Sequence, residues 1–552
     1  MSSLALQAAH DLTWDGPTGI DWSACKRRVR SLQRRIVKSL RAGDWRKVKR
    51  LCFLLVNSFA ARALGVKRVT ENSGKKTAGI DGKVWITPDH KMQAVRDIAH
   101  WKGYRPSPLK RIYIPKKDKS QKRPLSIPVM EDRARQAVHM QALQPIAETL
   151  ADGNSYGFRV KRQCADAIDQ CFKVLRQKTS ACWILEGDIK GFFDNIAFDW
   201  ILDHIPMNQK VLGAWLRCGF IDRGKKYPTT QGVPQGGVIS PVIGNMVLDG
   251  MEDVVLGSKA SRYRRAHNIN FVRYADDFIV TASNEAVLKD EIIPKINAFL
   301  EPRGVALSAQ KTKVTHISQG FDFLGQSVRK FERRGQLGKI QITPSQSSLA
   351  AIKAKVKAIC KASGGLTQAQ LIDKLNPVLR GWANYHRHVI CAENFCKLDS
   401  YVWGRLFRWA KRRHPDKTGR WIAERYFRSQ DGYRWTFADE ASSRALIHVQ
   451  QAVKQQRHIK VKAAANPFDP EWEAYFRDRE KLLKLKSVNE FIGKVLRKQN
   501  GECPVCRHVL ERSQEHCLHH IDGDKANKRI ANVVLLHRSC QPHSQQAGKA
   551  AA

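Results

Sequence analysis

Two short runs of apolar, β-prone residues flank a polar tip within residues 270–280. Phe271 and Val272 precede the tip and residues 278–280 follow it, so the pattern predicts two short strands joined by a tight turn. Asp276 and Asp277 lie side by side at this turn. Adjacent carboxylates repel each other unless a cation lies between them, and Mg²⁺ prefers carboxylate oxygens together with substrate phosphates. The alternative is an ordinary turn, because Asp favours turns for local hydrogen-bonding reasons alone.

A third carboxylate follows another apolar stretch. Residues 181–196 predict a strand that delivers Asp188 at its end, on a different strand from Asp276. Three acidic groups from two adjacent strands are the minimum that cages two metal ions while leaving positions for a substrate. The pattern therefore favours a two-metal site of the kind that polymerases use.

The N-terminal part of the chain alternates apolar and basic positions at helical spacing. This spacing predicts one amphipathic basic helix within residues 22–40 and a second that begins near Trp45. Residues 111–114 and 125–127 then predict a hairpin with a basic loop between them. Lys116 as a point charge and Arg123 as a bidentate clamp would suit a triphosphate, although a solvated loop has the same composition.

The charge of the chain identifies the kind of partner. Its 552 residues predict about three or four domains. The chain holds 96 Lys and Arg against 51 Asp and Glu, a net charge of +45, and the basic residues run through the whole length. Such a surplus implies a long polyanion, RNA or DNA. We expect no membrane partner, because no apolar run reaches eighteen residues, and no secretory signal, because the N-terminus lacks a basic region ahead of an apolar stretch.

Residues 345–450 are predicted to be helical, basic and rich in aromatic side chains. Aromatic residues interleaved with Arg suit RNA, because unpaired bases stack on flat side chains while phosphates meet guanidinium groups. The alternative is that Trp382, Trp403 and Trp409 pack between helices. The residues that follow, 451–490, are basic and polar, and on composition alone they form a solvated segment.

The thirteen cysteines are odd in number and mostly isolated, which favours a reducing compartment over a disulfide framework. Four residues near the C-terminus form an exception. Cys503-x-x-Cys506 and His537-x-x-Cys540 provide a Cys₃His set with two paired spacings, as structural zinc requires.

The order of the motifs resembles a known family. The segments IPKKDKSQKRPLSIP, SYGFR, LEGDIKGFFDNI, QGVPQGGVISPVIGNMVLD, FVRYADDFIV, LSAQKTKV and GFDFLG stand in the order of the reverse-transcriptase blocks of group II intron-encoded proteins. The resemblance runs from about residue 45 to the C-terminus and implies a multidomain α+β fold, a right-hand polymerase with an antiparallel palm sheet. Its implied parts are an N-terminal basic helical extension (1–70), fingers and palm (71–335), an α-helical thumb or maturase domain X (336–450), a basic DNA-binding linker (451–495) and a small zinc-containing ββα-metal HNH domain (496–552).

The resemblance also implies roles for single residues. Asp188, Asp276 and Asp277 would hold Mg²⁺ as the catalytic carboxylates. Five more residues would contact the incoming nucleotide. Lys116 and Arg123 would bind the triphosphate, and Gln235 would lie along the nucleotide. Lys311 would donate a proton to the pyrophosphate, and Phe193 would contact the sugar. Residues implied to contact RNA are Arg159, Arg380, Trp382, Tyr385, Arg405 and Lys411.

Phe193 distinguishes between types of polymerase. It falls five positions after Asp188, where reverse transcriptases resemble each other in having a bulky aromatic side chain that would collide with a ribose 2′-hydroxyl. This favours DNA synthesis over RNA synthesis. The alternative is that Phe193 is a core aromatic residue beside Phe192.

The segment between the two zinc pairs is similar to HNH nucleases. The similarity implies that His520 is the general base that activates water, that His519 is a ligand of the catalytic cation, Mg²⁺, and that Asn532 braces the loop. The chain departs from that pattern at Gln541, where a His is expected, and His543 lies two residues further on. The alternative is a zinc-stabilised module that binds DNA without cutting it.

These features predict an RNA-directed DNA polymerase and maturase. It would act with a group II intron RNA, nick a target DNA and copy the RNA from the nick with dNTPs, in the bacterial cytoplasm at the nucleoid or in an organelle. A host-domesticated reverse transcriptase and a non-enzymatic splicing factor are the alternatives, and the oligomeric state stays open.

Overall fold

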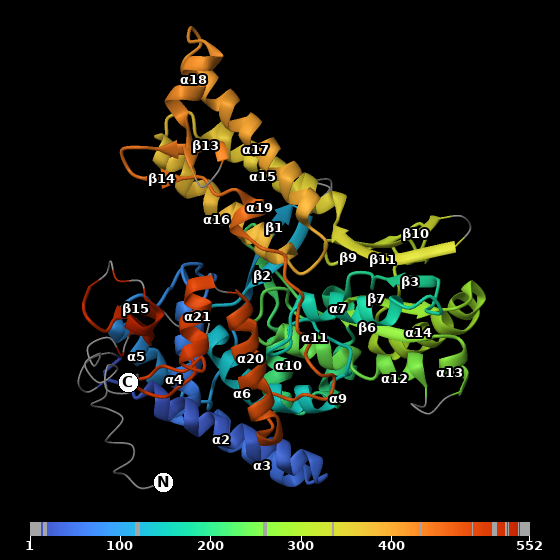
Figure 1. Cartoon of the computed structure of the whole chain (residues 1–552). Coiled ribbons are helices and arrows are strands. Elements are labelled where there is room, and N and C mark those ends of the chain that lie inside the picture. The colour runs from blue at the N-terminus through green and yellow to red at the C-terminus, as the bar shows by residue number, and fades with distance from the viewer. Residues whose placement is uncertain are drawn as a thin grey trace. The chain divides into compact units, whose positions relative to one another are not determined.

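The computed structural model forms two compact units, and each is described by itself (Figure 1). The first unit consists of Met1–Ala167, Ala181–Val314 and Val461–Glu473, and the second of Ile168–Ser180, Thr315–Lys460 and Ala474–Ala552. The structure describes residues 13–14, 19–115, 122–257, 262–333, 336–430, 433–487, 490–510, 516–524, 527, 529–538 and 540.

A layer of helices forms the N-terminal part of the first unit. Both predicted basic helices are present, α2 (Trp22–Arg41) and α3 (Trp45–Val56), and they precede α4 (Phe59–Glu71) and α5 (Pro88–Asp97). Asp21 caps α2 by accepting a hydrogen bond from the Ala24 N–H at 2.8 Å. The apolar stripe of α2 is buried, as amphipathic spacing requires. These helices pack on α6 (Met130–Leu150), which is buried along most of its length.

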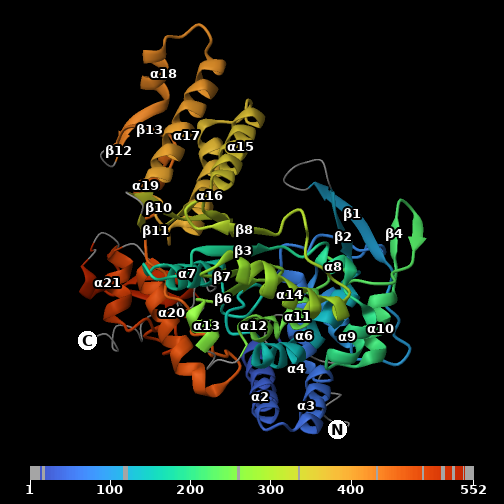
Figure 2. The same cartoon turned by 90° about the vertical axis from the view of Figure 1, so that its right-hand side faces the viewer.

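The predicted basic hairpin is part of a four-stranded sheet in the order β2-β1-β4-β5 (Figure 2). Strands β1 (Leu109–Pro115) and β2 (Lys122–Ile127) are antiparallel, with Arg123 opposite Ile114. Strand β4 (Phe220–Asp222) pairs in parallel with β1, and β5 (Lys225–Tyr227) completes the sheet.

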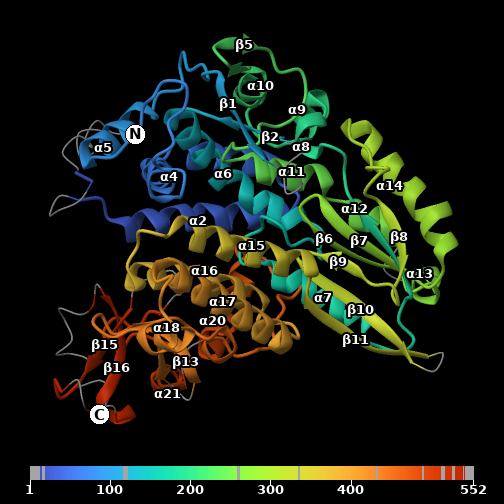
Figure 3. The same cartoon turned by 90° about the horizontal axis from the view of Figure 1, so that it is seen from above.

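The acidic turn belongs to a second sheet of the first unit, in the order β6-β7-β3-β8. Strands β6 (Asn270–Tyr274) and β7 (Asp277–Ala282) form the predicted hairpin, and β3 (Trp183–Gly187) pairs antiparallel with β7. Strand β8 (Lys313–His316) lies on the other side of β3. Both faces of the hairpin strands are buried, and the face with Phe271, Phe278 and Val280 packs in a core with residues of α14 (Ile293–Leu300), which runs beside the sheet in Figure 3.

The remaining elements around this sheet are short helices. Phe271, Phe278 and Val280 of the hairpin share one core with side chains from several of these helices. The helices are α8 (Phe192–Asn195), α9 (Phe198–His204), α10 (Gln209–Arg217), α11 (Ser240–Leu248), α12 (Met251–Leu256), α13 (Arg262–Ala266) and the π-helical turn Val287–Ile292 before α14. Helix α7 (Cys164–Leu175) begins in the first unit and continues into the second from Ile168.

The second unit begins with a three-stranded sheet and continues as a helical bundle. The sheet has the order β11-β10-β9, with β9 (Phe321–Phe323), β10 (Gln326–Arg333) and β11 (Gln336–Pro344). The helices are α15 (Gln346–Ala362), α16 (Gln368–His386), α17 (Ala392–Arg413), α18 (Gly419–Tyr426) and α19 (Val449–Ala452). Their core holds one long apolar stripe from each of α15, α16 and α17. A small sheet of β12 (Phe427–Gln430), β13 (Tyr433–Asp439) and β14 (Arg444–Ala445) interrupts the predicted helical region.

The C-terminal part of the second unit contains helices α20 (Glu473–Ser487) and α21 (Glu490–Lys498) and the hairpin of β15 (His516–His520) and β16 (Val533–His537). Its small core includes Cys503, Leu510 and the apolar side of β16. Among the described residues, no helix combines the length and the apolar character needed to cross a bilayer.

Candidate active site and metal centre

The β6–β7 turn presents two acidic side chains at the end of its sheet. Tyr274 and Asp277 are opposite each other in the register of the hairpin, and Ala275 and Asp276 form the tip. Ala275 is buried and has a φ of 59°, in the left-handed region that non-glycine residues rarely adopt. Asp276 is half-buried and Asp277 is exposed.

Asp188 follows directly after β3, beside this turn. Gly187 is opposite Phe278 in the register of β3 and β7, so Asp188 comes next to the acidic end of the hairpin. The Asp188 carbonyl accepts a hydrogen bond from the Ser308 N–H at 2.7 Å, which fixes the chain at this point. The Lys311 ammonium lies 3.1 Å from one Asp188 carboxylate oxygen and 3.3 Å from the other.

The electrostatics of Asp276 show that these groups converge. Burial raises the pKa of the Asp276 carboxyl, and the neighbouring Asp188 carboxylate raises it further, while Arg123 and Lys311 act in the opposite direction. A half-buried carboxylate next to another carboxylate requires positive charge to stay ionised. The donors are all oxygen, which is the chemistry that Mg²⁺ selects, so the type of donor fits this ion.

Gln235 lies beside both the hairpin sheet and the end of α8. Its backbone carbonyl accepts a hydrogen bond from the Ser126 N–H of β2 at 2.7 Å. Its side-chain amide donates to the two carboxylate oxygens of Asp194, each at 3.1 Å. The sequence did not single out Asp194, although it stands directly after Phe193. Of the predicted triphosphate contacts, Arg123 is exposed on β2 and Lys116 lies outside the described residues.

Phe193 is the second residue of the short helix α8. Its ring is half-buried, 5.1 Å from the ring of Phe192, while Phe192 itself is buried in the core. Gly244 of α11 makes room for it, because a Cβ at Gly244 would lie 2.9 Å from the Phe193 ring. Phe193 therefore packs on the core at one edge and keeps part of its ring exposed, which is compatible with both of its predicted roles.

The residues predicted to contact RNA differ in exposure. Arg380 and Tyr385 of α16 are exposed, and the Tyr385 hydroxyl donates to the Leu324 carbonyl at 2.8 Å. Trp382 is half-buried and donates through its indole N–H to Ser348 at 3.1 Å. Of the other tryptophans, Trp409 is buried and Trp403 is exposed.

Two basic side chains of α17 complete that set. Arg405 is half-buried, with its guanidinium 5.8 Å from the ring of Tyr401. Lys411 is exposed, and its ammonium donates to the carbonyls of Pro415 and Lys417 at 2.8 and 2.7 Å, so it also closes the C-terminal end of the helix.

The structure corrects one predicted RNA contact, that of Arg159. Its side chain is 5% exposed, and its guanidinium donates to the Glu148 carboxylate at 2.9 and 2.7 Å and to the Ser155 carbonyl at 2.8 Å. A guanidinium enclosed by acceptors in this way has no face left for RNA. The prediction was wrong because a basic cluster in a sequence carries no signal of its burial.

The four predicted zinc ligands come together. One ligand atom from each of Cys503, Cys506, His537 and Cys540 lies within 4.8 Å of the others. Among the described residues, this is the group of three or more potential metal ligands that lie close enough to hold one ion. The Cys506 sulfur is 3.3 Å from Nδ1 of His537. Three thiols and an imidazole at these distances match a structural zinc site.

The predicted nuclease residues lie on and after β15. His519 and His520 alternate along the strand, opposite Val534 and Val533, so their side chains face opposite sides of the hairpin. The Asn532 side chain accepts a hydrogen bond from the Asp522 N–H at 3.0 Å and donates to the Asp522 carboxylate at 2.7 Å. Asn532 thus braces the turn after His520. Gln541 and His543 lie outside the described residues.

Comparison with known families covers three successive parts of the chain. Residues 18–98 match the N-terminal domain of reverse transcriptase, residues 114–328 match reverse transcriptase (RNA-dependent DNA polymerase), and residues 349–427 match the group II intron maturase-specific domain. The middle match contains Asp188, Asp276 and Asp277, and the last contains α15 to α18.

Individual relatives agree with these matches. Protein YkfC of Escherichia coli is 29% identical over 320 residues, which cover 51% of this chain and 84% of the relative. The group II intron-encoded protein LtrA of Lactococcus lactis is 26% identical over 418 residues, covering 60% of this chain and 69% of LtrA. Maturase-like protein 1 of Euglena gracilis is 26% identical over 381 residues, covering 66% of this chain and 76% of the relative.

The chain therefore contains a reverse transcriptase domain of mixed α/β structure followed by a group II intron maturase domain. It is homologous to group II intron-encoded proteins, and the predicted resemblance is confirmed for the reverse transcriptase and maturase parts, whereas the HNH part stays a prediction.

Exchange of Phe193 for the smaller Val should weaken selection against ribonucleotides. If the ring excludes the 2′-hydroxyl, Phe193→Val should lower the ratio of kcat/KM for dNTP over rNTP by at least about 10-fold, measured with a primed RNA template. Phe192→Val, in the buried neighbour, is the control for loss of packing. Unchanged sugar selection in Phe193→Val, or an equal change in both variants, would assign Phe193 to the core alone.

Proposed function

We propose that Asp188, Asp276 and Asp277 are the catalytic carboxylates of an RNA-directed DNA polymerase with a right-hand layout. The observation that carries this proposal is the convergence of two acidic strand ends in one sheet, where burial and then the Asp188 carboxylate raise the pKa of Asp276. Bound Mg²⁺ would neutralise these carboxylates and polarise the reacting phosphate.

The chain's own residues would position the nucleotide at this centre. Arg123, together with Lys116, would bind the triphosphate, and Gln235 would lie along the nucleotide with its amide held by Asp194. The ring of Phe193 would leave space for a deoxyribose only. The Lys311 ammonium is paired with Asp188 and would protonate the pyrophosphate as it leaves.

The maturase part would bind intron RNA. We assign residues 71–335 to fingers and palm and 336–450 to thumb and domain X, with the N-terminal helices as a basic extension. The exposed Arg380, Tyr385 and Trp403 combine charge with flat aromatic surface, the combination that binds unpaired RNA. The homology of this part to intron-encoded maturases supports the same partner.

The C-terminal part, residues 496–552, would be a zinc-stabilised HNH endonuclease. The Cys₃His cluster supports the zinc, and the braced turn after His520 supports the nuclease. His520 would take the proton of the attacking water, and His519 would hold the cation. The protein would nick target DNA and copy the RNA from the nick with dNTPs, in the cytoplasm at the nucleoid or in an organelle. A module that binds DNA without cutting it is the competing function, because Gln541 replaces an expected His.

Loss of one metal-binding carboxylate should abolish polymerisation. Asp276→Ala should lower kcat for DNA synthesis on a primed RNA template by about 1,000-fold or more, because the remaining acids no longer hold both metals. Binding of intron RNA should stay within about twofold, since Asp276 is not among the residues proposed to contact that RNA. Asp199→Ala, at an exposed acid of α9, is the matched control. Synthesis by Asp276→Ala at the control's rate would refute the assignment.

Removal of one thiol from the Cys₃His cluster should release the metal. Cys506→Ser should reduce bound zinc from about one ion per chain to almost none, measured by elemental analysis, because structural zinc needs its complete ligand set. Cys517→Ser, in β15 of the same C-terminal part of the chain, is the control, with a thiol outside the cluster. Full zinc content in Cys506→Ser, or equal loss in Cys517→Ser, would contradict the site.

The nuclease assignment has its own test. His520→Ala should abolish nicking of a target DNA by the ribonucleoprotein while primer extension stays within about twofold of the parent rate. His508→Ala removes an exposed histidine of the same part of the chain and should leave nicking unchanged. Nicking by His520→Ala would refute its role as base, and no nicking by the parent would favour the DNA-binding module.

A further inference from the structure

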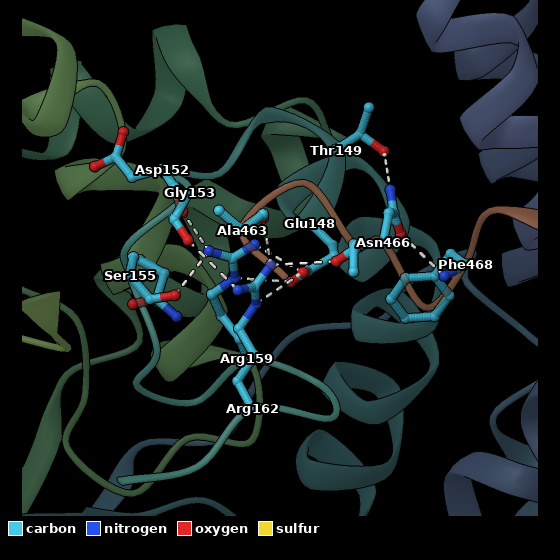
Figure 4. A network of polar contacts seen from close by, with 12 residues as sticks. Glu148, Thr149, Asp152, Gly153, Ser155, Arg159, Arg162, Ala463, Asn466 and Phe468 are labelled. Carbon is cyan, nitrogen blue, oxygen red and sulfur yellow. Dashed lines mark hydrogen bonds and ion pairs between the residues drawn. The ribbon is translucent and has the colours of Figure 1, made fainter. Parts of the chain in front are cut away.

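A short segment that follows the maturase domain in the sequence belongs to the reverse-transcriptase unit. Residues 461–469, here called the strap, were predicted to lie in a solvated basic linker, but Val461, Ala465, Asn466 and Asp469 are buried within the first unit. Figure 4 shows the strap residues Ala463, Asn466 and Phe468 beside Glu148, Arg159 and Arg162. The composition of the segment gave no sign of this, because its contacts are largely made by backbone groups.

Hydrogen bonds fix the strap along its length. The Val461 N–H donates to the Asp166 carboxylate at 2.8 Å, and the Asn466 amide donates to the Thr149 hydroxyl at 2.9 Å. Asp469 forms an ion pair with Arg41 of α2. Each end of the strap is therefore held by a charged side chain of the first unit.

The centre of the strap supplies acceptors to a buried guanidinium. One nitrogen of Arg162 donates to the carbonyls of Ala463 at 2.9 Å and Ala465 at 3.2 Å. The same side chain is 1% exposed and is paired with Glu148 at 3.3 Å. A buried guanidinium needs its donors satisfied, so the strap carbonyls complete the environment of Arg162.

Arg159 and Arg162, which are both paired with Glu148, hold the chain segment that packs against the catalytic turn. Arg159 donates to the carbonyl of Ser155 at 2.8 Å, and Arg162 contacts that of Gly153 at 3.4 Å. This segment, residues 152–157, lies against β6. The Tyr156 N–H donates to the Arg273 carbonyl at 2.9 Å, and the Arg273 N–H donates to the Asn154 carbonyl at 3.0 Å.

Gly157 brings the segment into direct contact with the turn. A Cβ at Gly157 would lie 2.3 Å from the backbone nitrogen of Ala275, so only glycine fits at this position. Ala275 is the residue before Asp276. Any displacement of residues 152–157 would therefore move the backbone that carries the catalytic carboxylates.

Arg273 supports the same turn from inside. Its fully buried guanidinium lies 2.5 Å from an Asp249 oxygen and 3.4 Å from an Asp152 oxygen, and it is 3.4 Å from the Ala275 carbonyl. Phe468 of the strap lines a cavity of about 20 Å³ together with Asp249 and Glu148. The strap thus lies at the same cavity as the acid that pairs with Arg273.

We propose that the strap is a positioning element of the polymerase centre, which closes the buried charge cluster and thereby fixes the catalytic turn from behind. This inference rests on the proposed role of Asp188, Asp276 and Asp277. It makes a segment beyond the maturase domain a determinant of the rate of DNA synthesis, through contacts within the reverse-transcriptase unit.

The test uses single-turnover nucleotide addition by the full chain on a primed RNA template. The double variant N466A/F468A should lower the rate constant about 10-fold at unchanged reaction amplitude, because small displacements of reacting groups reduce rate without reducing the fraction of folded enzyme. The apparent Kd for dNTP should stay within about twofold. Arg162→Lys, which keeps the charge but loses the fork that reaches both strap carbonyls, should have the same effect. The single variant Phe468→Leu should keep most of the parent rate constant, since Leu still fills the position at the cavity.

The control is Ala464→Ser, at an exposed position within the strap. Rate constants for N466A/F468A and Arg162→Lys equal to that of the control would overturn the inference. A lowered amplitude at an unchanged rate constant would also overturn it, because that result describes partial unfolding. If Asp276→Ala retains activity, the proposed polymerase centre is wrong. If Asp276→Ala is inactive and the strap variants match the control, only the role of the strap is wrong.

Discussion

The structure depends on holding carboxylates together against their own repulsion. Asp188 and Asp276 come from different strands, and their proximity together with burial raises the pKa of Asp276. Separate parts of the first unit supply the opposing charge, Arg123 from the β1–β2 hairpin and Lys311 from the chain before β8. A site built in this way favours cations and the phosphates that accompany them. The same repulsion means that the backbone around the turn must be held firmly from behind.

That support is itself electrostatic, but it is buried and balanced. Arg273, Arg159 and Arg162 are paired with carboxylates beneath the turn. Desolvation of an unbalanced buried charge is costly, and removal of any one charged member would leave the cluster with one charge in excess. Burial raises the pKa of Asp249 to about 7, even though the adjacent Arg273 acts to lower it. The cluster therefore holds the backbone beneath the turn in place, and this costs desolvation free energy that a purely apolar support would not lose.

The residues whose position follows from local pattern were predictable, and those defined by tertiary contacts were not. Three predicted features follow from local sequence pattern, and the structure has all of them. They are the β6–β7 hairpin, Asp188 at a strand end and the close approach of the two ligand pairs of the Cys₃His set. Arg159 was assigned to RNA because its neighbours in the sequence are basic, whereas its partner Glu148 lies eleven residues away on α6. The strap was missed for the same reason, since Arg162 and Ala463 are 301 residues apart. Contacts at such separations leave no periodic signal in one sequence.

The buried charge cluster does not add to the basic surplus of the chain. Its three arginines, Arg159, Arg162 and Arg273, are matched by Glu148, Asp152 and Asp249, so the cluster contributes nothing to the net charge of +45. On α2, Arg34 and Arg41 are also paired, with Glu473 beyond the strap and Asp469 within it, but their side chains stay partly exposed. The buried arginines of the cluster cannot provide the polyanion-binding surface. The surplus is therefore carried by other, more exposed side chains, and Arg380 beside Tyr385 on α16 has the exposure and the aromatic neighbour that RNA binding requires.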